Sequence, residues 1–110
     1  MKHVLFTQEM RQYFKDLVPV LYENKYFSFE EFAHDYVDKL FYDIKNSLPL
    51  HLHKPAPEYF NRYGKNMHYA TFKKNKQTTW YAFFTKYNVS GETIFLVRYI
   101  ANNHTVAQYL

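Results

Sequence analysis

Residues 78–100 read TTWYAFFTKYNVSGETIFLVRYI and give the strongest structural signal in the chain. Two runs rich in β-branched and aromatic residues, 78–87 and 93–100, flank a short segment that contains Gly91. This arrangement is typical of two antiparallel strands joined by a hairpin loop. The second run is apolar except for Arg98, so we predict that it lies inside a sheet.

A third strand is predicted on the N-terminal side of this hairpin. Residues 67–73 are rich in strand-forming side chains, and the polar segment 74–77 predicts a turn into the next strand. The connector that precedes them contains Pro55 and Pro57, which exclude a regular helix at its start. We expect one short helical turn within this connector, over residues 58–63.

Helical periodicity marks the N-terminal part of the chain. Thr7 is a suitable N-cap for a first helix. Pro19 removes a backbone donor and pushes Val18 away from helical angles, so we predict a kink or a break there. The apolar residues that share one face of this helix are Met10, Tyr13, Phe14, Leu17, Val18 and Leu21.

A second helix is predicted to end before Pro49. Ser28 and Glu31 have the spacing of a capping box, and Phe27 and Phe32 have that of a hydrophobic staple. The broad apolar face of this helix consists of Phe29, Phe32, Ala33, Tyr36, Val37, Leu40, Phe41, Ile44 and Leu48.

Helices followed by adjacent hairpin strands predict an α+β fold, in which two N-terminal helices pack on a C-terminal antiparallel β-sheet. The chain has 110 residues, which is the usual size of one domain. We therefore expect a single domain over residues 1–110.

The composition restricts the class of protein further. The chain has no Cys, which excludes disulfides and thiolate metal sites. The N-terminus lacks the apolar run of a signal peptide, and no segment approaches the roughly 18 apolar residues of a membrane span. These features predict a cytoplasmic protein that does not enter a membrane.

The formal net charge of +4 is distributed unevenly along the chain. The second half contains only two acids, Glu58 and Glu92. A basic half of this kind is typical of proteins that bind a polyanion or an acidic protein partner. Its Lys and Arg residues are Lys54, Arg62, Lys65, Lys73, Lys74, Lys76, Lys86 and Arg98.

Arg98 is the first candidate for a functional group. Strand alternation places it on the same face as Ile94, Leu96 and Ile100. A permanently charged guanidinium in an apolar strand has to be paired or open to solvent. Two interpretations stand side by side: an ion pair with a helix acid such as Asp35 or Asp38, and an anion-binding group on an exposed face.

Asn102, Asn103 and His104 follow this strand directly. The two amides and the imidazole are able to hydrogen-bond a ligand, and His104 is able to exchange a proton near neutral pH. Ordinary turn chemistry explains the same residues, because Asn favours tight turns and bonds its own backbone, and it is the favoured interpretation.

The turn between the first two predicted strands is the densest positive segment. Lys73, Lys74 and Lys76 lie close in sequence to several tyrosines, the combination with which RNA-binding sheets contact phosphates and bases. A solvated hairpin tip is the alternative. The only spacing that suits a metal is His51-Leu52-His53, and it lacks the further ligands that structural zinc requires, so we predict no metal and no other cofactor.

The order of elements resembles the RelE/ParE toxin superfamily. The resemblance rests on two N-terminal helices, a connector with prolines, and a meander whose last strands read WYAFF (80–84) and IFLVRYI (94–100). It implies a basic toxin that a co-encoded acidic antitoxin inhibits. Members of the RelE branch cleave mRNA on the ribosome and hold its backbone on the concave sheet, whereas members of the ParE branch inhibit DNA gyrase.

The resemblance also implies roles for individual residues. It places Lys73, Lys74 and Lys76 among the RNA contacts and His104 and Tyr109 among the candidates for catalysis. To these we add Arg62, Asn102 and Asn103 as candidate RNA contacts, and Arg98 and Lys73 as candidates for catalysis. The chain departs from the family just after the last strand, where a segment often rich in Arg is here Asn102-Asn103-His104. An amide supplies no positive charge to a phosphate that becomes more negative during reaction.

Three functions are compatible with these features of the sequence. A metal-free mRNA interferase is favoured by the lysine turn and by His104. A non-catalytic toxin-like module that binds a protein target such as DNA gyrase is favoured by the missing arginines. A domain without toxicity is the third, and an acidic open reading frame beside the gene would argue against it.

Overall fold

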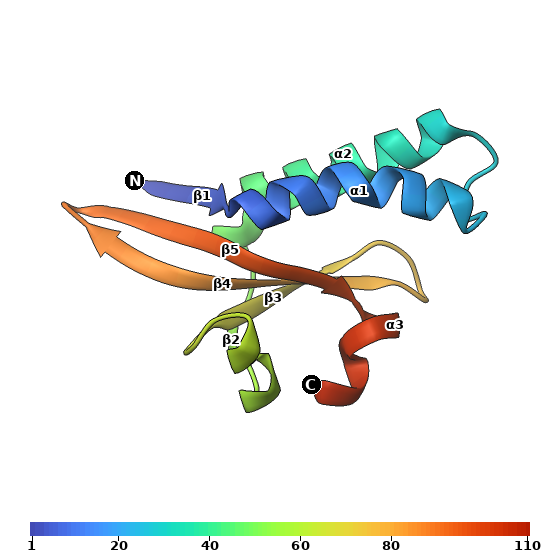
Figure 1. Cartoon of the computed structure of the whole chain (residues 1–110). Helices are drawn as coiled ribbons and strands as arrows, with labels where there is room; N and C mark the ends of the chain where they lie inside the picture. The colour runs from blue at the N-terminus through green and yellow to red at the C-terminus, as the bar shows by residue number, and fades with distance from the viewer.

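The computed structural model describes all 110 residues as an α+β protein built on one five-stranded mixed sheet with the order β1-β5-β4-β3-β2. Helices α1 and α2 cover one face, while the connector and the C-terminal segment lie on the other (Figure 1). The elements in chain order are β1 (Lys2–Phe6), α1 (Gln8–Glu23), α2 (Glu30–Ser47), β2 (Lys54–Pro55), β3 (His68–Lys73), β4 (Thr79–Val89), β5 (Glu92–Asn102) and α3 (Asn103–Val106).

The prediction of a wholly antiparallel sheet behind two helices was wrong in one respect. The chain begins with a strand, β1, which pairs parallel with β5 from Lys2↔Thr93 to Phe6↔Val97. Val4 and Phe6 face the core, whereas Leu5 between them is exposed. Five residues flanked by charge carry a weak local signal, and the pairing of β1 depends on the apolar strand β5 from the far end of the chain.

Of the two predicted outcomes at Pro19, a kink or a break, the break does not occur. Helix α1 continues to Glu23, and Thr7 caps its start by accepting a hydrogen bond from the Met10 amide at 3.3 Å. Pro19 lies on the exposed side of the helix. The carbonyl of Lys15, which has no amide donor at position 19, therefore stays accessible to water, and this lowers the cost of the proline.

The predicted capping box at Ser28 and the staple between Phe27 and Phe32 do not form. Helix α2 begins at Glu30 with Phe29 as its N-cap residue, and no side chain caps it. Phe27 instead packs on Tyr36, with ring centroids 5.3 Å apart. The helix starts one residue later than the capping box requires. Phe29 and Phe32, predicted for its apolar face, are 57% and 51% exposed, because the buried face consists of Ala33, Val37, Leu40 and Ile44.

Each face of the sheet supports its own apolar cluster. The larger cluster joins the inner faces of α1 and α2 to β1 and to one face of β3, β4 and β5. The smaller one lies on the opposite face, which we call the open face and which carries Tyr81, Phe83, Thr85 and Tyr87 of β4. Its five buried members are Phe60, Met67, Phe83, Ala101 and Val106.

A β-bulge interrupts the pairing of β4 with β5. Phe83 pairs with Tyr99 and Phe84 pairs with Val97, so Arg98 has no residue opposite it. An extra residue in one strand reverses the alternation beyond it. Ile100 therefore faces the helices, as its pairing with Ala82 shows, although alternation predicted the same face as Arg98.

The connections follow the sequence prediction closely. The connector contains a 3₁₀ helix at Glu58–Arg62, within the predicted 58–63. The hairpin between β4 and β5 is tighter than expected, because only Ser90 and Gly91 form the turn, with φ values of 51° and 81°. Two residues with positive φ are the hallmark of a type I′ turn, which suits the twist of the strands. No helix has the length and apolar character needed to cross a lipid bilayer.

Candidate functional site

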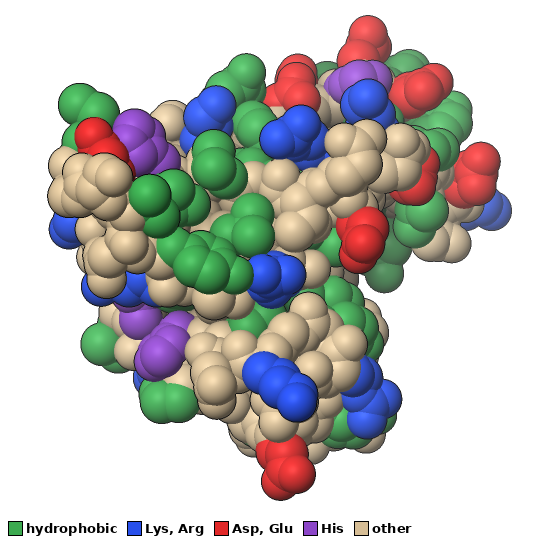
Figure 2. All heavy atoms as spheres, turned by 60° about the vertical axis from the view of Figure 1, so that its left-hand side comes forward, with side chains coloured by type: hydrophobic (Ala, Val, Ile, Leu, Met, Phe, Trp, Pro, Cys, Tyr) green, Lys and Arg blue, Asp and Glu red, His purple; other side chains and the backbone are tan.

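Charge is segregated between the layers of the molecule. The helical region, residues 8–47, contains five Lys and Arg against eight Asp and Glu, whereas the rest of the chain contains nine against two. In Figure 2 the acidic side chains gather mostly in the upper part of the view, at the height of the helices in Figure 1. The sheet and its connections therefore form the basic part of the molecule, which is the part suited to a polyanion.

The lysine turn, residues 73–78, lies against the start of α3. Asn103 joins the two segments, since its Oδ1 accepts a hydrogen bond from the Thr79 amide at 2.9 Å and its Nδ2 donates one to the Gln77 carbonyl at 3.0 Å. Asn102 caps α3, because its Oδ1 accepts from the His104 amide at 3.0 Å. Both predicted RNA contacts thus perform the turn chemistry that was the favoured interpretation.

The three lysines of the turn differ in their partners. Lys74 Nζ lies 3.2 Å from Asp43 Oδ2 of helix α2, so its charge is paired. Lys73 and Lys76 are exposed or half-buried and form no ion pair. Two of the three predicted phosphate contacts are therefore free to bind an anion.

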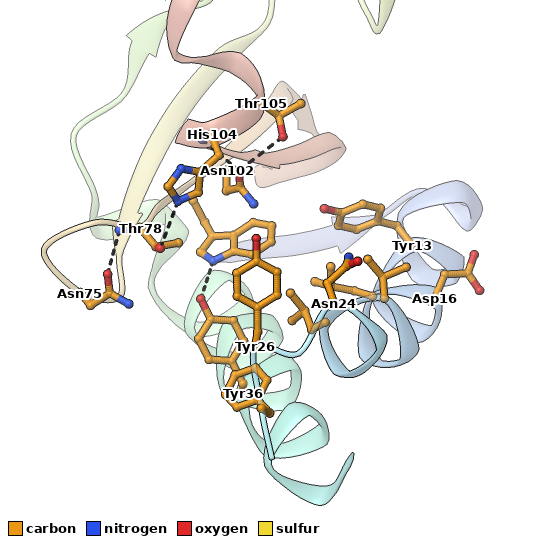
Figure 3. A pocket seen from close by; sticks show the side chains of 15 residues that line it. Tyr13, Asp16, Asn24, Tyr26, Tyr36, Asn75, Thr78, Asn102, His104 and Thr105 are labelled. Atoms are coloured by element: carbon orange, nitrogen blue, oxygen red, sulfur yellow. Dashed lines mark hydrogen bonds between the residues drawn. The ribbon is translucent and has the colours of Figure 1, made fainter. Parts of the chain in front are cut away.

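His104 lies beside the lysine turn and at the edge of a pocket. Its Nε2 is 3.4 Å from Thr78 Oγ1. The pocket has a volume of about 580 Å³ and opens between the end of α1, the loop after it, the lysine turn and the start of α3 (Figure 3). Trp80 and Tyr36 line it from the sheet and from α2. His104 is thus a predicted catalytic residue that lines this open pocket.

Arg98 lies on the open face, and no carboxylate pairs with it. Its Nε donates to Thr85 Oγ1 at 2.9 Å and its Nη2 donates to the Tyr87 hydroxyl at 2.7 Å. The ion pair with Asp35 or Asp38 does not form, because both acids belong to helix α2 on the opposite face. The remaining guanidinium donors are available to an anion, which agrees with the second interpretation of this residue.

Arg62 and Tyr109 come together in a stack on the connector side of the sheet. The Arg62 guanidinium carbon lies 3.9 Å from the centre of the Tyr59 ring, and the rings of Tyr59 and Tyr109 are parallel with centroids 3.6 Å apart. The neighbouring Tyr59 hydroxyl raises the pKa of Tyr109. Tyr109 is therefore a protonated phenol at neutral pH, which can donate a proton but cannot accept one as a base.

The predicted catalytic residues do not form one site. His104 contacts Thr78 just before β4, whereas Arg98 contacts Thr85 and points on toward Tyr87. Seven residues of extended chain between Thr78 and Thr85 span about 20 Å. His104 and Arg98 therefore cannot contact the same phosphate.

Sequence reasoning missed the partners that position these groups. Thr85 and Tyr87 hold Arg98, Tyr59 stacks with Tyr109, and Tyr36 accepts a hydrogen bond from Trp80 Nε1 at 2.8 Å. The hairpin register would have placed Thr85 and Tyr87 near Arg98, since all three share a face. No signal in the sequence brings Tyr59 to Tyr109, because their contact joins two short segments far apart in the chain.

His51 and His53 each bond a backbone carbonyl. His51 Nδ1 lies 2.8 Å from the Thr71 carbonyl oxygen, and His53 Nε2 lies 2.8 Å from that of Leu48. The two imidazoles thus tie the end of α2 to the sheet, and no group of three or more His, Asp or Glu residues is arranged to bind a metal.

Comparisons with protein-family models, with curated proteins and with solved structures find no match for this chain.

Proposed function

We propose that this protein is the toxin of a toxin–antitoxin pair, of the RelE/ParE type, and that it cleaves mRNA on the ribosome without a metal. The single observation that carries the proposal is the segregation of charge. Nine of the fourteen Lys and Arg residues lie outside the helical region with only two acids, and Lys73, Lys76, Arg62 and Arg98 have no carboxylate partner. A basic sheet layer of this kind suits a single-stranded polyanion.

The order of elements supports the same proposal. Two helices, a connector with prolines and an antiparallel meander of β3, β4 and β5 follow one another in the structure, and these are the features on which the resemblance rests. The acidic helix layer leaves the basic sheet layer as the complementary surface for an acidic antitoxin.

The proposed reaction is transesterification within the RNA. The 2′-oxygen bonds to the adjacent phosphorus while the bond to the next 5′-oxygen breaks, which leaves a 2′,3′-cyclic phosphate and a 5′-hydroxyl. His104 accepts the proton of the 2′-hydroxyl and returns a proton to the departing 5′-oxygen. Lys73 and Lys76 of the neighbouring turn stabilise the negative charge on the phosphate. Arg98, about 20 Å away along β4, binds another part of the strand in place of the reacting phosphate.

The test is cleavage of a reporter mRNA in a purified translation reaction. The unmodified protein is expected to cut the message, and His104→Ala is expected to lower the rate at least about 100-fold, the usual contribution of a general acid or base. His34→Ala is the matched control, since His34 is an exposed histidine of α2. Equal rates for His104→Ala and the unmodified protein would remove His104 from the mechanism, and no cleavage by either would overturn the nuclease.

A non-catalytic toxin that binds DNA gyrase is the second candidate. The distance between His104 and Arg98 favours it, because a binder does not need its basic groups around one phosphate. Pulse labelling after induced expression in a bacterium separates the two. Loss of protein synthesis alone supports mRNA cleavage, earlier loss of DNA synthesis supports the gyrase binder, and an unaffected culture overturns both.

A further inference from the structure

The pocket beside His104 has two aromatic walls that belong to different elements. Trp80 forms its floor and is 1% exposed, and its Nε1 donates to the Tyr36 hydroxyl at 2.8 Å. Tyr26, in the loop between α1 and α2, stands at the mouth and is 66% exposed (Figure 3). Tyr26 therefore offers a stacking surface to a flat ligand, whereas Trp80 lies buried beneath the pocket.

The rim of the pocket carries hydrogen-bonding groups that the protein itself leaves free. Asn75 and Asn102 use only their Oδ1 atoms, so both Nδ2 groups are available, and the side-chain amide of Asn24 has no protein partner. The Tyr13 hydroxyl forms no hydrogen bond either, and the ring points from α1 toward Asn102 in Figure 3. Burial raises the pKa of Tyr13 to about 12, so the hydroxyl keeps its proton and can donate it in a hydrogen bond.

The charge of the pocket limits what it binds. No Lys or Arg lines it, and Asp16 and His104 are its only carboxylate and imidazole side chains. Gln12 Nε2 donates to Asp16 Oδ1 at 2.9 Å, and Asp16 points away from the interior in Figure 3. A phosphate would find no positive charge inside, so the pocket suits a neutral, planar molecule with several donors and acceptors on its edges.

We propose that this pocket binds a nucleobase, stacked on Tyr26 above the buried Trp80 and held at its edge by Asn24, Asn75 and Asn102. Asparagine amides are good partners for base edges, and stacking on aromatic rings is the usual way to hold an unpaired base. The inference rests on the proposed RNA binding for the source of the base. Asn75 and Thr78 belong to the lysine turn, which also carries the unpaired Lys76.

The volume agrees with this occupant. Sites for small molecules measure about 300–1,000 Å³, and about 580 Å³ therefore accommodates a base together with its ribose. The pocket lies on the side of the sheet that faces the helices, whereas Arg98 lies on the open face. It is therefore a second contact for the strand, separate from the one at Arg98.

Trp80 is the only tryptophan in the chain, so its fluorescence reports directly on the pocket. We expect adenosine, guanosine, cytidine or uridine to change this fluorescence saturably, and ribose 5-phosphate, which lacks a base, to have no effect. A short RNA is compared with the same RNA carrying one abasic site. If the protein binds RNA but not nucleosides, and the abasic site weakens that binding, the pocket holds a base within a strand. If the protein binds nucleosides as well, the pocket also accepts free nucleosides. Saturation-transfer NMR on the same ligands is the second measurement.

Variants decide whether the pocket is the site. Tyr26→Ala is expected to weaken binding about fivefold or more, the value of one stacking contact, while Tyr26→Phe keeps the ring and retains most of the affinity. Tyr42→Ala is the control, since Tyr42 is an exposed tyrosine of α2 that does not line the pocket. The inference is overturned if neither measurement detects a nucleoside or RNA, or if Tyr42→Ala weakens binding as much as Tyr26→Ala.

The same experiments separate this inference from the proposed function. Growth arrest and mRNA cleavage by a protein that binds no base would reject base binding in the pocket and keep the proposed toxin function. Nucleoside binding by a protein that does not arrest growth would reject the proposed toxin function and keep base binding in the pocket.

Discussion

Gly64 illustrates how single residues hold the connector against the open face of the sheet. A methyl group at this position would lie 2.8 Å from Arg98 Cδ and 3.1 Å from Met67 Sδ. Both distances are shorter than ordinary van der Waals contacts, so a larger residue has to displace the stem of Arg98 from the position that places its guanidinium on Thr85. The glycine thus contributes to the placement of the arginine.

We predict that Gly64→Ala lowers the free energy of unfolding by about 1–3 kcal/mol, the usual cost of overpacking. In an Arg98→Ala background the same substitution is expected to cost distinctly less, because the closest obstructing atom is gone. Urea denaturation of the four proteins of this double-mutant cycle measures both values. Equal costs in the two backgrounds would show that Arg98 is not the obstacle.

Glu92 at the hairpin tip makes the stability depend on pH in the acid range. The hydrogen bond from His3 Nε2 at 3.0 Å, followed by the terminal ammonium at 3.4 Å, lowers the pKa of Glu92. A carboxyl whose pKa is lower in the folded state stabilises that state above its ordinary pKa, and the contribution disappears as the pH falls through the folded pKa. The charged carboxylate of Glu92 therefore joins β1 to the tip of the hairpin only when the pH is above the pKa of Glu92 in the folded state.

Glu92→Gln is predicted to lower Tm at neutral pH and to have no effect on Tm at a pH well below the ordinary range of glutamate. Thermal unfolding followed by circular dichroism over this range measures the difference. Glu58→Gln, at an exposed acid without an ion pair, is the control. A Glu92→Gln effect that stays constant with pH would contradict the electrostatic explanation.

Among the elements, the end of α1 has a well-defined stop. Lys25 has φ of 62°, and its amide and that of Tyr26 bond the carbonyls of Tyr22 and Leu21 at 3.0 and 3.1 Å. These are the two hydrogen bonds of a Schellman motif, in which glycine usually takes the left-handed position that Lys25 takes here. The motif also directs Tyr26 to the mouth of the pocket.

Lys25→Gly is predicted to raise the free energy of unfolding by up to about 1 kcal/mol, because glycine adopts positive φ without a steric penalty. Lys39→Gly, within α2, is expected to lower it by about 1 kcal/mol. Chemical denaturation of both variants beside the unmodified protein provides the measurement. A loss of stability in Lys25→Gly would mean that the lysine side chain contributes more than its backbone strain costs.

On the scale of the whole molecule, the separation of an acidic helix layer from a basic sheet layer predicts that the proposed binding to RNA is sensitive to salt. Each phosphate that a lysine neutralises releases a counterion, so the logarithm of the binding constant falls with the logarithm of the salt concentration. Lys73 and Lys76 lie outside the acidic layer and have no ion pair, and they are expected to account for two such contacts.

Replacing Lys73 and Lys76 by Gln is therefore predicted to reduce the salt slope for a single-stranded RNA by about 1.4, or about 0.7 for each contact. Lys15 and Lys39 replaced by Gln form the control, since that pair changes the net charge equally within the helix layer. Fluorescence anisotropy at several salt concentrations measures the slopes. The same reduction in both double variants would mean that net charge alone governs binding.

Local patterns in the sequence predicted most of the elements. The hairpin of β4 and β5, the strand β3, the short turn in the connector and the extent of α2 up to Pro49 all follow from periodicity and from the positions of Pro and Gly. The turn chemistry of Asn102 and Asn103 was also open to prediction, because an asparagine bonds backbone groups only a few residues away in space or sequence. These features depend on interactions that a short stretch of chain makes with itself.

Contacts between distant parts of the chain decided the rest. The pairing of β1 with β5 made the sheet mixed, and the bulge at Arg98 moved Ile100 to the opposite face. At this bulge Arg98 points toward the hairpin tip, where it bonds Thr85. His104 follows the end of β5 and lies beside the lysine turn. The two residues are therefore far apart in space although only six positions separate them in sequence. The α+β class follows from the sequence because local periodicity encodes it, whereas the site depends on strand register and layer packing, which only long-range contacts determine.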